Sequence, residues 1–251
     1  MASYLITGSS RGIGLAVAAL LASKPSSEVS KVFASARSNT DSLREIIAEY
    51  AGRVEYVQLD VTSEESVKEA ARHVEKSLDG RGLDVLINNA GIMSKGTSVD
   101  KMEDLEKVFS INVTGVQYVS TAFLPLLRKG SLKKVINISS TLGSITTAPT
   151  YRFHPVPAYM VSKAALNMLT VQWSLTLESE GFTVVALSPG WIKTDLGGSY
   201  ADLTIEQGST ATLDIILRVT AEDTGKFFNV HVAGWEKAEG VNQYDGKCPP
   251  W

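Results

Sequence analysis

Tyr159 and Lys163 form a pair whose residue types and spacing could support acid–base chemistry. Residues four positions apart share one face of a helix, so a phenol and an ammonium would be neighbours there. A neighbouring cation favours the phenolate and lowers the pKa of a tyrosine below its usual value of about 10. The pair therefore predicts a proton donor or acceptor that works near neutral pH. An ordinary Tyr–Lys contact on a surface helix is the alternative.

Hydroxyl, amide and carboxylate side chains follow three apolar stretches upstream of this pair. Residues 135–138 lead into Ser139 and Ser140, and residues 83–88 lead into Asn89. Alternation along a strand would point the two serines to opposite sides, so only one of them would face a reaction site. Asp60 follows the third stretch, where it could also merely cap a loop.

A glycine-rich turn lies between the first apolar stretch and the first helical one. It reads T-G-S-S-R-G-I-G over residues 7–14, with glycines at positions 8, 12 and 14. Glycine allows a tight turn and a close approach to a ligand, and a helix N-terminus offers free N–H groups to a pyrophosphate. The spacing differs from the G-x-G-x-x-G fingerprint of dinucleotide sites, so a turn without a ligand remains the alternative.

Short apolar stretches alternate with helical patterns along the whole chain, which is typical of βαβ units and a parallel sheet. The predicted strands cover residues 4–7, 31–36, 54–59, 83–88, 134–138, 183–187 and 227–232. The predicted helices cover residues 12–23, 41–50, 64–78, 102–127, 158–180 and 205–219. We therefore expect one α/β domain with a doubly wound parallel sheet of about seven strands and helices on both faces. The apolar run 13–22 also imitates a secretory signal, but the strand and glycine turn before it favour a buried helix.

Three local features add to this pattern: a helix cap, an irregular segment and a C-terminal tail. Thr62 and Glu65 have the spacing of a capping box and predict that Thr62 caps the helix over residues 64–78. The irregular segment 146–157 contains three prolines, which exclude regular structure. The C-terminal tail, residues 233–251, could pack on the body or close a site.

Composition narrows the class of protein. The chain has 251 residues, of which 44% are hydrophobic and 20% charged, with a formal net charge of −3. This balance suits a folded globular chain and gives no basic footprint for nucleic acid. No apolar run reaches the roughly 18 residues of a membrane span. The single cysteine, Cys248, excludes an intrachain disulfide and indicates a reducing, cytoplasmic location. We predict no metal site, because the three histidines show no ligand spacing.

Taken together, these motifs closely resemble the short-chain dehydrogenase/reductase family. T-G-x-x-x-G-x-G, Asp60-Val61, N-N-A-G at residues 88–91, the internal Asn112, Ser140, Y-x-x-x-K and Pro189-Gly190 occur in the family's order. The resemblance covers residues 3–232 and implies a single NAD(P)-binding Rossmann domain over residues 1–251.

The resemblance also implies roles for individual residues. Tyr159 would exchange a proton with the substrate oxygen, Lys163 would bind the nicotinamide ribose and lower the Tyr159 pKa, and Ser140 would hydrogen-bond that oxygen. Asn112 would hold a helix kink and a water of a proton relay. The implied catalytic set is Asn112, Ser140, Tyr159 and Lys163. The implied cofactor contacts are Gly8, Arg11, Gly12, Ile13, Gly14, Arg37, Asp60, Asn89, Gly91, Tyr159, Lys163, Ile192 and Thr194.

The stretch between Ser140 and Tyr159 is longer than the family commonly shows. This length, together with the end of the tail, resembles the sniffer-type carbonyl reductases and C-factor-like proteins. The extra residues would lie near the mouth of the active site, where we predict that His154 is a solvated loop histidine. The candidate pocket residues are Met93, Thr141, Leu142, Tyr151, Phe153 and Trp191, an apolar and partly aromatic set.

The end of the second predicted strand favours NADP(H) over NAD(H). An NAD-specific unit commonly places an acidic residue there to accept from the ribose 2′-OH. This chain instead has Arg37, with no acid before Asp41, and a guanidinium would attract a 2′-phosphate. Arg11 could approach the same phosphate from the other side. A solvated loop role for Arg37 is the alternative.

The leading hypothesis is an NADP-dependent carbonyl reductase or alcohol dehydrogenase acting on a small molecule. The alternative is a cofactor-binding regulatory or signalling protein of the C-factor type with little turnover. We also predict a homodimer or homotetramer built on the helices over residues 102–127 and 158–180. The second of these is apolar on nearly all sides, which is typical of a helix buried all round. Its outer face would meet a symmetry mate or, alternatively, the tail.

Overall fold

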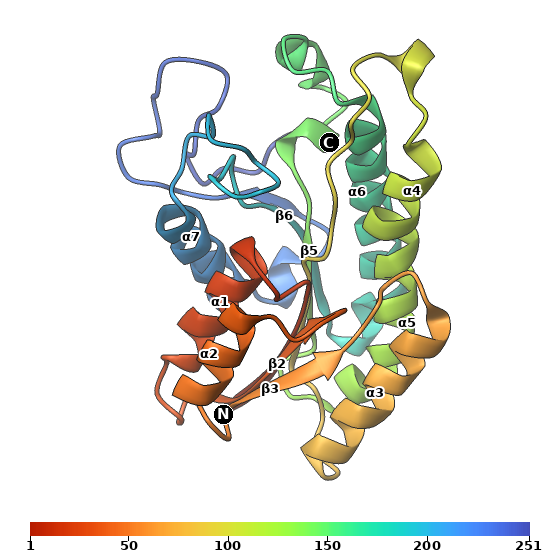
Figure 1. The fold of residues 1–251 in the computed structure, drawn as a ribbon, viewed down its shortest axis with the longest axis vertical. Helices are drawn as coiled ribbons and strands as arrows, with labels where there is room; N and C mark the ends of the chain where they lie inside the picture. The colour runs from red at the N-terminus through yellow and green to blue at the C-terminus, as the bar shows by residue number, and fades with distance from the viewer.

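The computed structural model describes residues 1–251 and contains one sheet of seven parallel strands in the order β3-β2-β1-β4-β5-β6-β7 (Figure 1). The strands are β1 Ala2–Thr7, β2 Val29–Ala36, β3 Val54–Gln58, β4 Val85–Asn88, β5 Lys134–Ile138, β6 Thr183–Ser188 and β7 Phe227–Asn229. The strand order reverses between β1 and β4, which is where open α/β sheets form their ligand crevice. The predicted doubly wound, Rossmann-type fold is confirmed.

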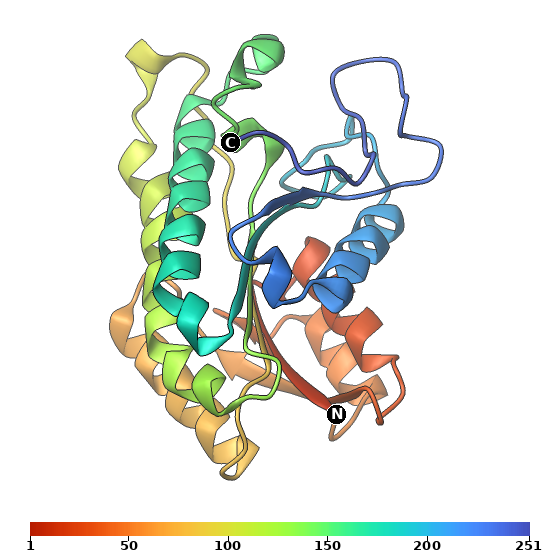
Figure 2. The same ribbon diagram turned by 180° about the vertical axis from the view of Figure 1, so that it is seen from behind.

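Helices cover both faces of this sheet (Figures 1 and 2). On one face lie α1 Gly12–Ala22, α2 Asp41–Glu49 and α7 Ile205–Arg218. On the other lie α3 Glu64–Leu78, α4 Leu105–Phe109, α5 Gly115–Lys129 and α6 Pro157–Leu177. Because successive side chains point to opposite faces, Ile6 packs with Leu21 on one side of β1, whereas Leu5 packs with Phe123 on the other. The sheet therefore sits between two apolar cores.

The helix predicted over residues 102–127 is interrupted. A 3₁₀ turn at Val99–Lys101 precedes α4, and a π-helical segment at Ser110–Thr114 separates α4 from α5. Helix α6 begins one residue earlier than predicted, because proline is well tolerated in the first turn of a helix. The run that imitates a secretory signal folds as α1.

The predicted Thr62 cap is wrong. Ser63 caps α3, and its Oγ accepts a hydrogen bond from Ser66 N at 3.2 Å. Thr62 instead donates its hydroxyl proton to Asp60 Oδ1 at 2.7 Å. The Asp60 carboxylate is a strong nearby acceptor, so Thr62 donates to it. The hydroxyl of the next residue, Ser63, then caps the helix.

The last strand is shorter than predicted because the C-terminal tail folds back onto residues 230–232. Val232 N donates to Tyr244 O at 3.0 Å, and Gly246 N donates to Val230 O at 3.2 Å. The irregular segment 146–157 contains one 3₁₀ turn, Ala148–Tyr151. The C-terminal tail and the segment 146–157 both lie at the end of the sheet opposite the N-terminus, as Figure 2 shows.

The outer face of α6 is open to solvent in the single chain. Val161, Met168 and Leu175 are 47%, 61% and 62% exposed. The tail therefore does not cover this face, and its contact with a symmetry mate stays a prediction. None of the helices combines the length and apolar character that crossing a bilayer requires.

Candidate active site

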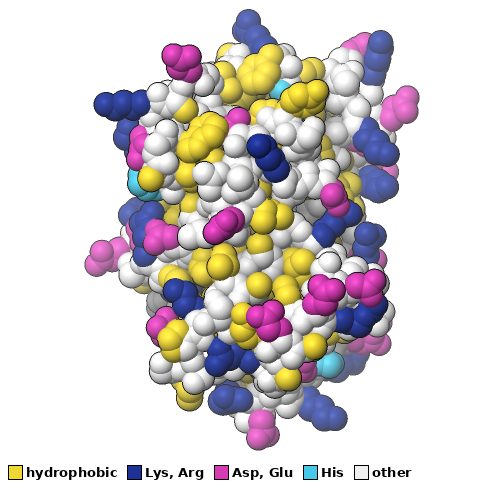
Figure 3. Space-filling model, turned by 60° about the vertical axis from the view of Figure 1, so that its left-hand side comes forward, with side chains coloured by type: hydrophobic (Ala, Val, Ile, Leu, Met, Phe, Trp, Pro, Cys, Tyr) yellow, Lys and Arg dark blue, Asp and Glu magenta, His cyan; other side chains and the backbone are white.

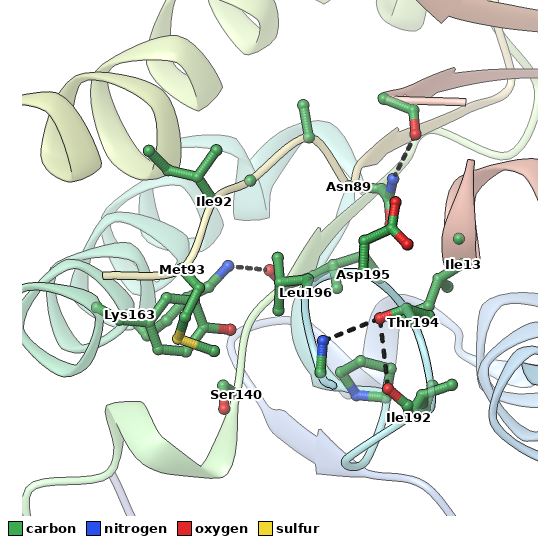
Figure 4. A pocket seen from close by; sticks show the side chains of 18 of the residues that line it. Ile13, Asn89, Ile92, Met93, Ser140, Lys163, Ile192, Thr194, Asp195 and Leu196 are labelled. Carbon is green, nitrogen blue, oxygen red and sulfur yellow. Dashed lines mark hydrogen bonds between the residues drawn. The ribbon is translucent and has the colours of Figure 1, made fainter. Parts of the chain in front are cut away.

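A cavity of about 1300 Å³ opens at the carboxyl ends of the strands, where the strand order reverses. Figure 4 shows Met93, Ser140 and Lys163 on one side of it and Ile13, Ile192, Thr194 and Asp195 on the other. Of the predicted site residues, those that line the cavity are Gly8, Arg11, Gly12, Ile13, Arg37, Asp60, Asn89, Gly91, Ser140, Tyr159, Lys163, Ile192 and Thr194. Gly14 and Asn112 lie outside its lining. The six candidate pocket residues all line it as well.

Tyr159 and Lys163 project from the first two turns of α6 and are almost fully buried, with 7% and 5% exposure. The Lys163 Nζ atom lies 5.5 Å from the centre of the Tyr159 ring and donates a hydrogen bond to Ile138 O at 2.7 Å. Burial lowers the pKa of Lys163 to about 8, because removal from water disfavours the ammonium.

The pKa of Tyr159 differs from the sequence expectation. Burial raises it to about 12, although a hydrogen bond with Ser140 acts in the opposite direction. The cation lies over the ring and bonds to the Ile138 carbonyl, so desolvation of the phenol prevails. Tyr159 is therefore protonated at neutral pH, the state that a proton donor needs.

The two serines after β5 have different surroundings. Ser139 is buried, and its hydroxyl donates to Asn167 Oδ1 at 2.5 Å. Ser140 caps the short 3₁₀ turn Thr141–Gly143 by accepting from Leu142 N at 3.2 Å, and its hydroxyl also meets Tyr159. The side chain beside the phenol is therefore that of Ser140, the serine that the family resemblance implies.

The glycine-rich turn has a conformation that other residues rarely adopt. Gly8 and Gly12 have φ angles of +71° and +59°, in the left-handed region. A Cβ on Gly14 would come within 2.5 Å of Gly8 O, so that glycine is needed for packing inside the turn. The turn thus presents the N-terminus of α1 to the cavity.

Asn89 holds this turn against the end of β4. Its Nδ2 donates to Thr7 O at 2.8 Å and Gly8 O at 3.2 Å, while its main-chain N–H donates to Thr7 Oγ1 at 2.9 Å. Figure 4 shows the Asn89 side chain reaching across from its own loop. The amide donors of Asn89 are therefore already engaged with the turn.

Asn112 lies in the π-helical segment and is fully buried. Its Oδ1 accepts from Ile92 N at 2.9 Å, and its Nδ2 donates to Ile92 O at 3.0 Å and Ser162 Oγ at 3.0 Å. Ser162 in turn donates to Tyr159 O at 2.7 Å. The irregular segment thus places an amide between the loop after β4 and the helix that carries Tyr159.

The far end of the cavity is cationic at Arg37. Asp60 is beside it, with a pKa lowered chiefly by hydrogen bonds from Thr62 and, to a smaller extent, by the Arg37 charge. Asp60 thus caps its loop as well as lining the cavity. Arg11 forms an exposed ion pair with Asp195 at 3.1 Å, an arrangement across the cavity mouth that the sequence did not indicate.

Sequence reasoning missed several lining residues. Asn242 and Tyr244 of the tail line the cavity, but neither belongs to a recognisable motif. His154 lies in a loop, as predicted, but it is not fully solvated. It lines the cavity, half-buried, with its ring centre 5.9 Å from that of Trp191. Tertiary contacts alone bring these residues to the site. No group of three or more His, Cys, Asp or Glu side chains is placed to hold a metal ion.

Residues 3–203 match the family model described as short chain dehydrogenase. The chain therefore belongs to the short-chain dehydrogenase/reductase family. It is 38% identical to the C-signal protein of Myxococcus xanthus over 152 residues, which cover 59% of this chain and 88% of that protein.

Two solved structures resemble the whole chain. The NADPH-bound carbonyl reductase from chicken fatty liver is 34% identical, with a TM-score of 0.85 over 99% of this chain and 98% of the other. The carbonyl reductase Sniffer of D. melanogaster is 28% identical, with a TM-score of 0.85 over the full length of both chains. The predicted resemblance to the sniffer-type subgroup is confirmed.

Proposed function

We propose that this protein is an NADP-dependent carbonyl reductase, or alcohol dehydrogenase in the reverse direction, with Tyr159 as proton donor and acceptor. The observation that carries the proposal is the meeting of a buried, protonated Tyr159 with Ser140 and Lys163 in one large cavity. A binding module has little need of a phenol placed in this way. The similarity to two carbonyl reductases supports the same reaction class.

The cavity fits a nicotinamide dinucleotide. It extends from Arg37 after β2, past the glycine turn, to the Tyr159 side of the sheet. We propose that the N–H groups at the start of α1 hold the pyrophosphate, that Arg37 holds a 2′-phosphate, and that Lys163 holds the nicotinamide ribose. Ile192 and Thr194 line the nicotinamide end. When bound, the reduced cofactor supplies the hydride that a carbonyl carbon accepts.

The chain's own residues supply the proton and the orientation. Tyr159 donates its phenolic proton to the carbonyl oxygen while the carbon receives the hydride, so the product is the alcohol and the residue is left as phenolate. Ser140 donates a hydrogen bond to the same oxygen, and the Lys163 cation stabilises the phenolate. Asn112 positions the helix that carries Tyr159 and, as the resemblance implies, a water that returns the proton.

A regulatory role with little turnover is the second candidate. The similarity to C-signal over part of the chain favours it. NADPH oxidation by the purified protein with a panel of aldehydes, ketones and quinones separates the two candidates. Turnover with any of them that depends on Tyr159 supports the reductase. Tight NADPH binding without oxidation by any carbonyl favours the regulatory role. The cytoplasm, expected from the single cysteine, is the proposed compartment.

A further inference from the structure

Segments far apart in the sequence meet at one carboxylate, that of Asp202. Its Oδ2 accepts a hydrogen bond from the Tyr244 hydroxyl at 2.6 Å and a second from Asn242 Nδ2 at 2.8 Å. Asn242 and Tyr244 line the cavity, whereas Asp202 is not part of its lining. The carboxylate therefore acts on the cavity only through the two tail side chains that it holds.

Tyr244 extends this arrangement to the turn after β6. Its hydroxyl accepts a hydrogen bond from Trp191 N at 3.1 Å. Its ring lies so close to the turn that a Cβ on Gly190 would come within 3.0 Å of Tyr244 Cε1. Burial and the bond to Asp202 raise the pKa of Tyr244 far above its usual value, so the hydroxyl keeps the proton it donates.

Asn242 extends the arrangement to the segment 146–157. Its Oδ1 accepts a hydrogen bond from the Tyr151 hydroxyl at 3.3 Å, and this hydroxyl also lies 3.2 Å from Thr141 Oγ1. Tyr151 is buried and lines the cavity, and Thr141 directly follows Ser140. A chain of hydrogen bonds thus links the tail to both sides of the place where a carbonyl would lie.

The outer surface of these segments carries several exposed apolar side chains among its charged ones. Figure 3 shows hydrophobic side chains exposed over the upper part of this face of the molecule. Leu196, Tyr200 and Val241 belong to the turn and the tail and are 42%, 91% and 39% exposed. The half-buried Asp202 carboxylate joins the turn and the tail through its two hydrogen bonds.

We propose that Asp202, Asn242 and Tyr244 form a specificity clamp, which sets the width of the carbonyl-binding half of the cavity. The proposal rests on the reductase function proposed above. A carboxylate that accepts two hydrogen bonds holds its donors more firmly than a neutral acceptor does. The clamp holds the Tyr151 hydroxyl through Asn242 and the Trp191 main chain through Tyr244. By fixing these two lining residues it would favour compact carbonyl compounds over those with a second ring next to the carbonyl. Asp202 is a positioning residue in this arrangement.

The test compares benzaldehyde with benzophenone as substrates, with NADPH as reductant. Tyr244→Phe keeps the ring but loses the bonds to Asp202 and Trp191, and Asp202→Asn keeps the shape but loses the charge. We expect each variant to raise the ratio of kcat/KM for benzophenone to that for benzaldehyde by about tenfold, mainly through a lower KM for benzophenone. NADPH affinity should stay unchanged. Tyr200→Phe is the matched control, because that exposed side chain is outside the cavity lining.

Hydrogen–deuterium exchange at the Trp191 amide adds a readout that does not depend on turnover. Exchange should become faster in both clamp variants and remain at the wild-type rate in Tyr200→Phe. The clamp inference is overturned if the substrate ratio of both variants stays within about twofold of wild type, whether or not exchange changes. Failure of the wild type to reduce any carbonyl would overturn the proposed function, and the clamp inference with it. Wild-type turnover with an unchanged ratio overturns the clamp alone.

Discussion

Two buried lysines lie at opposite ends of β5 and differ in what surrounds them. Lys134 begins the strand and donates to Ile216 O at 3.3 Å and Leu217 O at 3.1 Å, in the last turn of α7. Lys163 lies against the other end, donates to Ile138 O, and faces the cavity. Burial lowers the pKa of both. Burial and a lowered pKa alone therefore do not mark a catalytic group.

Other polar groups at the two edges of the sheet show the same difference between closely packed and open surroundings. At the amino edge, the Asp84 carboxylate accepts from Ser3 N and Ser131 N, both at 2.8 Å. Main-chain atoms would lie 2.1 Å from a Cβ at Gly82 or Gly130, so no space for a ligand remains there. At the carboxyl edge, Tyr159 and Ser140 face a cavity. Polar groups satisfied within the chain stabilise the fold, whereas those that face open space are available for chemistry.

The largest expected effect is at the carboxyl edge. Tyr159→Phe keeps the ring and its packing but removes the ionisable hydroxyl. We expect turnover to fall about 10²–10⁴-fold while NADPH binding persists. Steady-state kinetics and NADPH titration provide the measurements, with Tyr200→Phe as the control. Turnover within about threefold of wild type would show that the acid–base assignment is wrong.

Arg37→Ala tests the cofactor end of the same edge. A charge-assisted hydrogen bond contributes about 1.5–3 kcal/mol, so loss of the guanidinium should weaken NADPH binding about tenfold or more. NADH affinity should change little, because NADH lacks the 2′-phosphate. Dissociation constants for both cofactors in wild type and variant are the measurement. Equal wild-type affinities, or an unchanged ratio in the variant, would contradict NADP preference. Arg44→Ala removes an exposed arginine outside the cavity and is the control.

Lys134→Met tests the amino edge. The variant leaves the last carbonyls of α7 without their donor. We therefore expect its free energy of unfolding, measured in urea, to be about 1–3 kcal/mol lower than that of wild type. The kcat should be retained. Lys163→Met should show the reverse pattern, with turnover lost and stability kept, because Ile138, whose carbonyl loses this donor, borders the cavity, where water can replace the donor. Similar losses of turnover in the two variants would contradict a structural role for Lys134 and a catalytic role for Lys163.

The pH dependence of stability tests the lowered pKa of Lys163. The folded-state pKa of Lys163 is about 8, below its unfolded value of 10.5. Between these values the unfolded chain binds more protons, so the contribution of Lys163 to stability rises with pH from about 8 to about 10. Urea melts across this range should show a rise of about 2 kcal/mol in wild type relative to Lys163→Met. A wild-type curve parallel to that of the variant would contradict the lowered pKa.

The smallest expected change concerns the two faces of α6. Its inner face carries Tyr159 and Lys163, while Val161, Met168 and Leu175 are exposed on the outer face. We propose that a second copy covers this outer face in a homodimer or homotetramer. Light scattering should give at least twice the mass of one chain, and Met168→Lys should reduce it. A monomeric wild-type mass at micromolar concentration would refute the oligomer.

The alternating elements, the glycine turn and the polar residues at the strand ends can be read from the amino-acid sequence. These features depend on local periodicity, on backbone freedom and on contacts within one turn, so short stretches of sequence carry them. The seven strands and the meeting of Ser140, Tyr159 and Lys163 were predictable for this reason, since parallel strands bring their carboxyl ends to one edge.

Features that depend on distant partners become visible only in the folded chain. The interrupted helix around Asn112, the cap at Ser63 and the position of His154 all result from contacts that no local pattern encodes. The raised pKa of Tyr159 results from burial that the whole fold creates. The tail that brings Tyr244 to the cavity contacts residues more than forty positions away along the chain, so no sequence motif could have placed it there.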